Sequence, residues 1–417
     1  MTIEEIDLTD ADFFVSGDPH RAWTVMRAED PVHWDERRPG RGYWSLTRYD
    51  DARFVYLNAT TFSNEHGQIL TFGDDDWIGN RQMMLLLDPP HHTQMRLIVS
   101  KRFTPRAVAP EEAHVREIAA KVIDAVASRG ECDFVTDVAA RIPTAIICEM
   151  MGVPREDHDM MFELGSMAIG SNDPEYQIDG DRQKTGDAAQ QGMFRYFVNL
   201  VEERKRAAGA DLVSALVHGD MAGRKLSDME VLFNCFLLIL GGQETTRNTL
   251  SGGMLALIEN PEQWERLDRA NGNPALMRTT VEEFLRWTSP ITHVMRTAMT
   301  DAEIRGHKIK AGDKVVIWNA SANRDEQVFA DPFKFDIGRW PNEHLAFGYG
   351  EHFCLGSHLA RLELRIMIEE VTRRMRDMQL TAPVQRLRSN SHAGIKHMPV
   401  RFTPSPAPQG KDLGAVA

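Results

Sequence analysis

The sequence is poor in cysteine and lacks any paired cysteine motif. Only four cysteines occur among the 417 residues, and they are scattered at Cys132, Cys148, Cys235 and Cys354. Disulfide-stabilised secreted domains and zinc knuckles both need cysteines in pairs or clusters, so the sequence indicates neither class. We therefore expect a protein of the reducing cytoplasm.

The sequence also lacks a long apolar run, a surplus of basic residues and a flexible internal linker. Its longest uninterrupted apolar run is CFLLIL, residues 235–240, far below the roughly 20 residues of a membrane span. The acidic start MTIEEIDLTDADFF has no secretory signal pattern. A net charge of −13 argues against nucleic acid as a partner. We expect one catalytic domain over residues 1–403, no membrane attachment, and a disordered Pro/Ala-rich tail over 404–417.

Helical periodicity is the dominant pattern that is present. The segments 110–130 and 187–209 both show apolar residues at helical spacing and a closing glycine. Short β-like runs broken by Gly-His and Gly-Asp occupy 296–323, and a helix rich in apolar residues returns at 357–378. The predicted fold class is mainly α with a smaller β-rich part, α+β in a loose sense.

A cysteine stands in a glycine-rich turn directly before the helix predicted at 357–378. The stretch is FGYGEHFCLG, residues 347–356, and its cysteine is Cys354. The unpaired N–H groups and the dipole of a helix N-terminus stabilise a thiolate. From the residues alone, three interpretations stay open: a buried structural cysteine, a zinc ligand together with His352 and His358, or the thiolate ligand of a haem iron.

The same stretch resembles the haem-ligand signature of the cytochrome P450 monooxygenases, and the likeness to bacterial members extends along almost the whole chain. The fixed positions of that signature are met by Phe347, Gly348, Gly350, His352, Cys354 and Gly356. The resemblance implies a triangular-prism helical body that holds haem b between a central long helix and the helix after the cysteine loop. It also implies that Cys354 binds the iron.

The stretch LLILGGQETTRNTL, residues 237–250, places two glycines and several polar residues inside an apolar helical pattern. One interpretation is a helix weakened by glycine whose Thr hydroxyls bond carbonyls four residues earlier. The resemblance implies instead the helix that passes over the haem, with a kink at Gly241 that opens a groove for dioxygen. Thr245 would then hydrogen-bond the bound oxygen and Glu244 would relay protons. Gln243 replaces a histidine that is frequent in bacterial members.

Two further sets of residues match family patterns, although each is ordinary as a solvated face or a surface ion pair. The resemblance implies that four donors bind the two haem propionates: His92, Arg96, Arg296 and His352. It also implies a structural ion-pair trio behind the haem: Glu283, Arg286 and Arg339.

A local basic face on this acidic chain would suit an acidic electron donor. The expected members of that face are Lys101, Arg102, Arg106, Arg361 and Arg365, with scattered solvated residues as the alternative. Because the sequence shows no flavin or iron–sulfur segment, we expect electrons from NAD(P)H to arrive through ferredoxin reductase and ferredoxin. We expect the enzyme itself to be a monomer.

Apolar stretches mark the expected substrate pocket. Its predicted lining residues are Ile69, Leu70, Met84, Gly241, Ile291, Val294 and Ile395. The resulting hypothesis is a monooxygenase that inserts one oxygen atom from O2 into a hydrophobic small molecule such as a polyketide, terpenoid or sterol-like compound. Epoxidation, oxidative coupling or peroxide-driven oxidation on the same fold is the main alternative. A non-catalytic carrier of haem or of a hydrophobic ligand is the remote one.

Overall fold

The computed structural model describes residues 1–36, 42–70, 81–270 and 272–405. The tail predicted to be disordered begins at 404, and its residues 406–417 lie outside this described part. No helix within the described ranges has the length and apolar character needed to cross a membrane.

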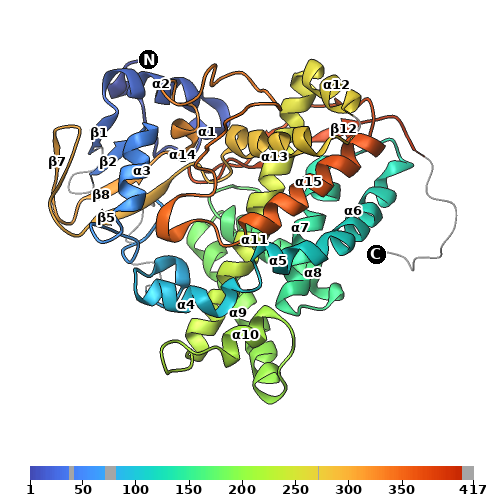
Figure 1. The fold of residues 1–417 in the computed structure, drawn as a ribbon, viewed down its shortest axis with the longest axis horizontal. Helices are drawn as coiled ribbons and strands as arrows, with labels where there is room; N and C mark the ends of the chain where they lie inside the picture. Colours follow the sequence, from blue (N-terminus) through green and yellow to red (C-terminus); the bar gives the residue numbers. More distant parts are fainter. Residues whose placement is uncertain (37–41, 71–80, 271, 406–417) are drawn as a thin grey trace.

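Most of the described chain is helical (Figure 1). The α-helices are α1 (Phe13–Ser16), α2 (Pro19–Glu29), α3 (Tyr49–Leu57), α4 (His91–Ser100), α5 (Pro105–Val108), α6 (Glu112–Ala127), α7 (Arg141–Met151), α8 (His158–Ile169), α9 (Arg182–Arg206), α10 (Leu212–His218), α11 (Asp228–Glu259), α12 (Pro261–Arg269), α13 (Pro274–Thr288), α14 (Asn319–Ala322) and α15 (Ser357–Arg374). A short 3-10 turn, η6 (Gly350–His352), precedes α15.

The strands form small sheets at the margins of the helical body. They are β1 (Val32–Asp35), β2 (Tyr43–Leu46), β3 (Phe62–Ser63), β4 (Glu131–Asp133), β5 (Val294–Ala298), β6 (Ala302–Ile304), β7 (His307–Ile309), β8 (Lys314–Ile317), β9 (Gln379–Leu380), β10 (Gln385–Arg386), β11 (Ile395–His397) and β12 (Pro399–Arg401). The largest sheet has the order β1-β2-β8-β5-β3, and only its β2–β8 pair is parallel. Smaller sheets are β4-β12-β9, β10-β11 and β6-β7.

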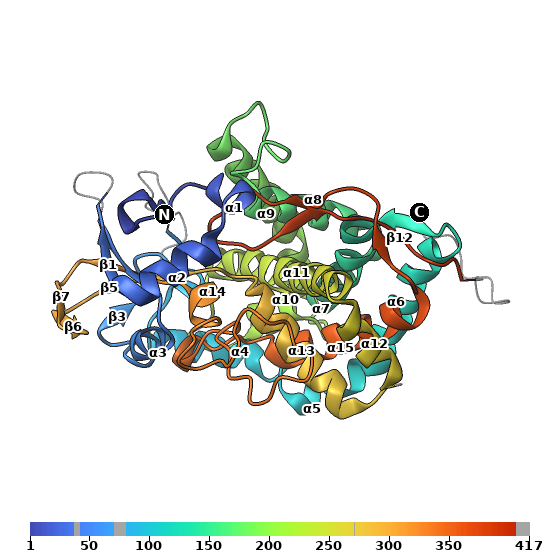
Figure 2. The ribbon, with the colours of Figure 1, turned by 90° about the horizontal axis from the view of Figure 1, so that it is seen from above.

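Helix α11 is the central element of the helical body. It contacts α7, α8, α9, α13 and α15, and Figure 2 shows it running through the middle of the molecule. Its N-terminus is fixed by a capping box in which Ser227 and Glu230 exchange hydrogen bonds. One large apolar cluster joins this helix to its neighbours. The large sheet, at the left of Figure 1, packs against a separate apolar cluster. The residues that α11 presents are therefore held rigidly at the centre of the fold.

Most elements predicted from the sequence are confirmed. The predicted helix at 110–130 is α6, the one at 187–209 overlaps α9 but was expected to end three residues later, and the β-rich stretch at 296–323 contains most of β5 and all of β6 to β8. Helix α15 is buried on two sides, since Ile366 on one face and Ile368 on the other are both fully buried. Residues 395–401 form two strands on either side of Met398. The two differ in their partners, because β11 pairs with β10 while β12 pairs with β4 and β9.

Candidate functional site

The cysteine loop holds Cys354 just before the N-terminus of α15. Gly348 and Gly350 take φ angles of +69° and +68°, which only glycine adopts without strain. A Cβ on Gly350 would also lie 2.6 Å from the backbone oxygen of Tyr56. The turn is closed by the Cys354 N–H, which donates to the Phe347 oxygen at 2.9 Å. The two glycines are therefore needed for this turn.

The Cys354 thiol is deep in the protein but not sealed. Burial raises the pKa of the thiol, whereas the Gly356 N–H and the charges of Arg96 and Arg361 act in the opposite direction. The residue nevertheless retains accessible surface. A backbone N–H donor and nearby positive charge both favour the thiolate form of cysteine, which is the form that binds a metal. The described residues contain no group of three His, Cys, Asp or Glu side chains that could hold a metal ion, so the zinc interpretation with His358 is wrong.

Four basic side chains predicted from the sequence meet beside the cysteine loop. The rings of His92 and His352 lie with their centroids 3.9 Å apart. Arg96 donates from Nη2 to the Phe353 oxygen at 2.7 Å. Arg296 is buried with its guanidinium 5.5 Å from the centre of the Tyr56 ring. Their positions come from α4, β5 and η6, which are far apart in the sequence.

This basic cluster has no carboxylate partner within the described chain. None of the four residues forms a salt bridge with the described residues, and Arg296 donates only to the neighbouring Met295 oxygen, at 2.8 Å. His92 Nδ1 and His352 Nε2 are buried without a hydrogen-bond partner. Burial, together with nearby positive charge, lowers the pKa of His92 to about 4 and that of His352 to about 2. Buried cations and orphaned donors of this kind are costly unless an anion is bound. A group with two carboxylates fits the cluster.

Helix α11 has open space beside it at the first residue of its glycine pair. Gly241 is exposed although the helix on both sides of it is buried, and nothing lies within 4 Å of a Cβ placed on it. A Cβ on Gly242 would instead lie 2.7 Å from Ile147, so this second glycine permits close packing against α7. The helix assignment continues from Asp228 to Glu259, so the glycines do not break it. A flat group can approach α11 at Gly241.

The polar residues after the glycines point in different directions. Thr245 donates to the Gly241 oxygen at 3.0 Å, which is the back-bonding that the sequence offered as one interpretation. Glu244 is buried and forms an ion pair with Arg247. Ser166 Oγ lies 3.5 Å from the Glu244 carboxylate and accepts from Arg247 at 3.3 Å. Burial raises the pKa of Glu244, and Arg247 opposes that shift.

The sequence analysis missed both partners of Glu244. Arg247 could have been found, because a spacing of three residues puts it on the same helix face. Ser166 could not, because it comes from α8, 78 positions earlier.

The three residues of the predicted ion-pair trio are in contact with one another. Arg286 donates to both carboxylate oxygens of Glu283, at 2.7 and 2.8 Å. Arg339 Nε lies 3.2 Å from the same carboxylate. All three side chains are buried or nearly so, and Arg286 also bonds the Asn323 and Pro332 oxygens at 2.9 Å. The trio ties α13 to the segment that leads into the cysteine loop.

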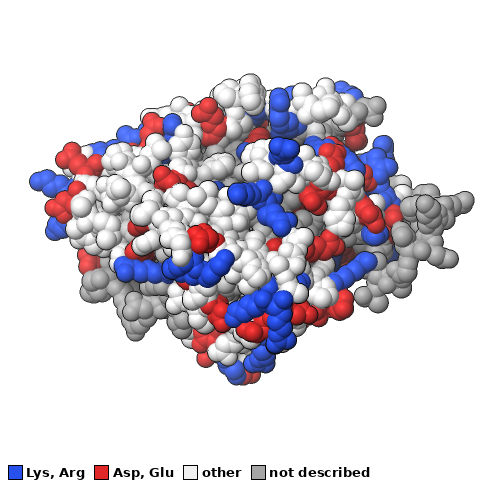
Figure 3. All heavy atoms as spheres, turned by 60° about the horizontal axis from the view of Figure 1, so that its bottom comes forward, with Lys and Arg blue, Asp and Glu red and all other residues white. Residues whose placement is uncertain are grey.

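The predicted basic face is only partly correct. Lys101, Arg102 and Arg106 are exposed and form no ion pair with the described residues. Arg361 instead binds Glu282 through two hydrogen bonds, of 2.7 and 2.9 Å. Arg365 is paired with two carboxylates, those of Glu112 and Glu369. Figure 3 shows Lys and Arg mixed with Asp and Glu on the face it presents.

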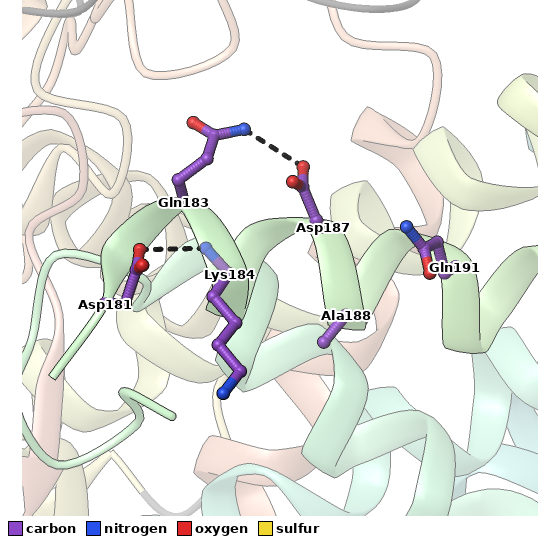
Figure 4. A pocket seen from close by; sticks show the side chains of 6 residues that line it. All are labelled: Asp181, Gln183, Lys184, Asp187, Ala188 and Gln191. Carbon is purple, nitrogen blue, oxygen red and sulfur yellow. Dashed lines mark hydrogen bonds between the residues drawn. The ribbon is translucent and has the colours of Figure 1, made fainter. Parts of the chain in front are cut away.

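The predicted substrate residues are dispersed over several packing environments. Met84 and Ile395 belong to the main apolar cluster, Leu70 to a cluster with the N-terminal helices, and Val294 packs against the sheet cluster. Ile69 and Ile291 are partly buried. A surface pocket of about 450 Å³ lies elsewhere, at the start of α9 (Figure 4). None of the predicted substrate residues lines this pocket. Its mostly polar lining consists of Asp181, Gln183, Lys184, Asp187, Ala188 and Gln191.

Comparison with known proteins agrees with this geometry. The family model for cytochrome P450 matches residues 32–388. The chain is 38% identical over 426 residues to the methyl-branched lipid omega-hydroxylase of Mycobacterium tuberculosis, covering 97% of this chain and 96% of that protein. It is 36% identical over 410 residues to the steroid C26-monooxygenase of the same species, covering 95% and 92%.

Solved structures give the same result for the fold. The Mycobacterium marinum cytochrome P450 CYP268A2 in complex with pseudoionone superposes with a TM-score of 0.90 at 32% identity, covering 95% of this chain and 98% of that one. CYP109E1 from Bacillus megaterium in complex with testosterone gives a TM-score of 0.83 at 30% identity, with coverage of 94% and 99%. The mainly helical fold with its smaller sheets, predicted from the sequence, is confirmed as theirs.

Proposed function

The chain belongs to the cytochrome P450 family and is a haem-iron monooxygenase, and from this premise we propose that it binds haem b through Cys354 and oxidises a hydrophobic lipid or sterol-like molecule. The observation that carries the proposal is the position of Cys354 beside the basic cluster. Cys354 stands beside four basic side chains, two of them buried and two half-buried, that form no salt bridge with the described residues. Haem b has an iron that takes a thiolate and two propionates that take such donors.

Each part of the site has a defined task in this proposal. Cys354 binds the iron, while His92, Arg96, Arg296 and His352 hold the propionates. When bound, the haem supplies the one-electron and dioxygen chemistry that no side chain can perform. The free space beside Gly241 would accommodate part of a bound group or a small ligand against α11.

Glu244 and Thr245 move protons in the proposed reaction. Reduction of dioxygen to water and one inserted atom consumes two protons, so a dry site needs a path for them. Thr245 keeps accessible surface beside Gly241 and can exchange its bond to that carbonyl for a bond to a ligand. Glu244 is a titratable group next to it, held by Arg247 and Ser166. A non-catalytic carrier would have no use for this pair of residues.

The substrate class rests on the relatives. Two of them are named for oxidation of a methyl-branched lipid and of a steroid, and two solved relatives are in complex with pseudoionone and testosterone. These names support a hydrophobic substrate for this chain. The predicted lining residues Ile69, Leu70 and Ile291 are apolar, as burial of such a molecule requires.

The proposed electron donor is a ferredoxin that is reduced by NAD(P)H through its reductase. The exposed side chains of Lys101, Arg102 and Arg106 follow α4, which carries Arg96 to the cysteine loop. An acidic protein bound there would be close to the proposed iron ligand.

The experiment that tests the function is the replacement Cys354→Ser, with the protein purified in both forms. The wild type is expected to bind haem and to give the thiolate-type absorption of the reduced, carbon monoxide-bound state. The variant is expected to lose that absorption. A wild type that takes up no haem, or a variant with an unchanged spectrum, contradicts the assignment. Titration of the wild-type spectrum with a methyl-branched fatty acid and with a steroid then tests the substrate class.

A further inference from the structure

The segment between α8 and α9, residues 170–181, is tied to the C-terminal strands by a set of ionic contacts. Lys396 Nζ lies 2.9 Å from Asp173 Oδ1 and 2.7 Å from Glu175 Oε2. His397 Nε2 lies 2.9 Å from Glu175 Oε1, and His397 Nδ1 lies 2.6 Å from Asp133 Oδ2 at the end of β4. Two adjacent residues of β11 thus connect the 170–181 segment to β4.

Arg388, between β10 and β11, adds backbone contacts to the same segment. Its own N–H donates to Asp173 Oδ2 at 2.8 Å, and its Nη1 donates to the Asn172 oxygen at 2.9 Å. The Arg388 guanidinium also forms an ion pair with Asp12, which connects the N-terminal region to the same segment. Asp173 is only 2% exposed, so its charge depends on these partners.

The 170–181 segment begins one turn after Ser166, the α8 residue that contacts Glu244 and Arg247 of the central helix. Tyr176 packs against Gly170, since a Cβ on that glycine would come within 2.3 Å of the tyrosine ring. Burial raises the pKa of Tyr176, the charge of Glu244 acts in the same direction, and that of Arg247 opposes it. The phenol is therefore close to the buried pair formed by Arg247 and Glu244.

We propose that Lys396 and His397 form a pH-sensitive clamp that holds the 170–181 segment closed over the Glu244 side of α11. Opening of the clamp would admit water and substrate to this side of the site, so its protonation would regulate access. The regulatory meaning rests on the proposed function, because Glu244 matters only if the chain performs that reaction.

The groups that face His397 determine the sign of the pH effect. The carboxylates of Asp133 and Glu175 flank its two ring nitrogens, Lys396 is its chain neighbour, and the residue opposite it on β10 is the uncharged Gln385. Burial lowers the pKa of His397, but the bonds to Asp133 and Glu175 outweigh this and raise it above the usual 6.5. Charged His397 therefore stabilises the closed 170–181 segment fully below about pH 6.5, and this stabilisation is lost as the pH rises through the raised pKa.

The test measures hydrogen exchange of the backbone amides of residues 172–178 in the haem-loaded protein at pH 6 and pH 8, expressed as protection factors that correct for the intrinsic exchange rate. Protection in the wild type should fall at the higher pH, by up to roughly tenfold for each unit by which the pKa is raised. His397→Gln should show lower protection at pH 6 and no fall between the two pH values. Lys396→Met should lower protection at both values and keep the fall.

His114→Gln is the matched control, because His114 also contacts a carboxylate, that of Glu149, but lies on α6. It should behave as the wild type. Protection that does not change with pH in the wild type, or a fall that persists in His397→Gln, overturns the clamp. The haem absorption spectrum verifies that each variant is folded. A missing thiolate-type spectrum would contradict the proposed function and leave the exchange result valid for the clamp.

Discussion

Arg296 shows what a single buried cation can be worth to a binding site. In the structure its guanidinium forms no salt bridge with the described residues; it lies against the Tyr56 ring and donates to a backbone oxygen. Its burial therefore lowers the stability of the protein without ligand, and it strengthens binding once a carboxylate pairs with the charge. Replacing Arg296 by Met should have opposite effects on the haem-free and the haem-loaded protein.

We expect Arg296→Met to raise the free energy of unfolding of the haem-free protein and to weaken haem binding. A hydrogen bond to a charged group contributes about 1.5–3 kcal/mol, so haem should be lost roughly 10- to 100-fold faster. Denaturant unfolding and transfer of haem to an acceptor protein measure the two effects. Arg106→Met, an exposed arginine, should change neither. A loss of stability in the haem-free variant would show that Arg296 is a structural residue.

Thr245 carries a second prediction at the scale of one side chain. Its hydroxyl donates to the Gly241 oxygen at 3.0 Å and has accessible surface, whereas Thr249 one turn later makes the same kind of bond at 2.8 Å and is buried. If Thr245 delivers protons, Thr245→Ala should still bind substrate but release the electrons as hydrogen peroxide. Positioned proton donors contribute about 100-fold or more, so product formed per NAD(P)H should fall at least about tenfold.

Thr249→Ala is the control for loss of a helix back-bond without loss of a group facing the site. Oxygen uptake, peroxide and product are measured together in the two variants. Equal coupling of electrons to product in wild type and Thr245→Ala would remove Thr245 from the proposed proton path.

At the scale of the element, the cysteine loop depends on a backbone that only glycine provides. Gly350 combines a φ of +68° with a close approach to the Tyr56 oxygen, whereas Gly306, in the turn between β6 and β7, has a φ of +84° and free space around it. A left-handed conformation costs a residue with a side chain about 1–2 kcal/mol. Gly350→Ala should therefore lose more stability than Gly306→Ala, because the clash with α3 is added to the same backbone cost.

The displaced loop should also alter the site, since Cys354 is four residues from Gly350. Chemical unfolding gives the two stabilities, and the absorption spectrum of the haem-loaded protein gives the state of the thiolate. A spectral change in Gly350→Ala with none in Gly306→Ala is expected. Equal losses of stability and unchanged spectra in both would mean that the contact with Tyr56 does not constrain the loop.

At the scale of the whole molecule, the features that the sequence predicted correctly are those formed by residues close together in the chain. The signature around Cys354, the pair His92 and Arg96 one turn apart, and the periodicity of α6 and α15 are all local patterns, and the structure has them where they were expected. The fold itself was predicted through the family resemblance carried by those patterns.

Contacts between distant segments could not be predicted in the same way. Arg361 was expected to belong to a basic face, but it is paired with Glu282, which lies 79 positions earlier, on α13. Glu175 and His397 are 222 positions apart. Charge alone gives no sign of such partners, because either residue would be an ordinary solvated side chain without the fold that brings the two together.

The distribution of paired and unpaired charge leads to a prediction about the electron donor. Since Arg361 and Arg365 are already paired, the members of the predicted basic face that form no ion pair with the described residues are Lys101, Arg102 and Arg106. Attraction between exposed charges acts mainly on the rate of association and is screened by salt. Replacing all three by Gln should slow reduction of the haem by a ferredoxin by roughly 10-fold or more at low ionic strength.

The same replacement should flatten the dependence of that rate on salt, because little steering would remain to be screened. A matched triple variant removes three exposed basic residues elsewhere, Arg195 on α9 with Lys308 and Lys310 at β7, and so changes the net charge equally. Stopped-flow reduction over a range of salt concentrations compares the two. If both variants slow the reaction alike, the overall charge of the molecule governs the encounter and the face beside the cysteine loop has no special part in it.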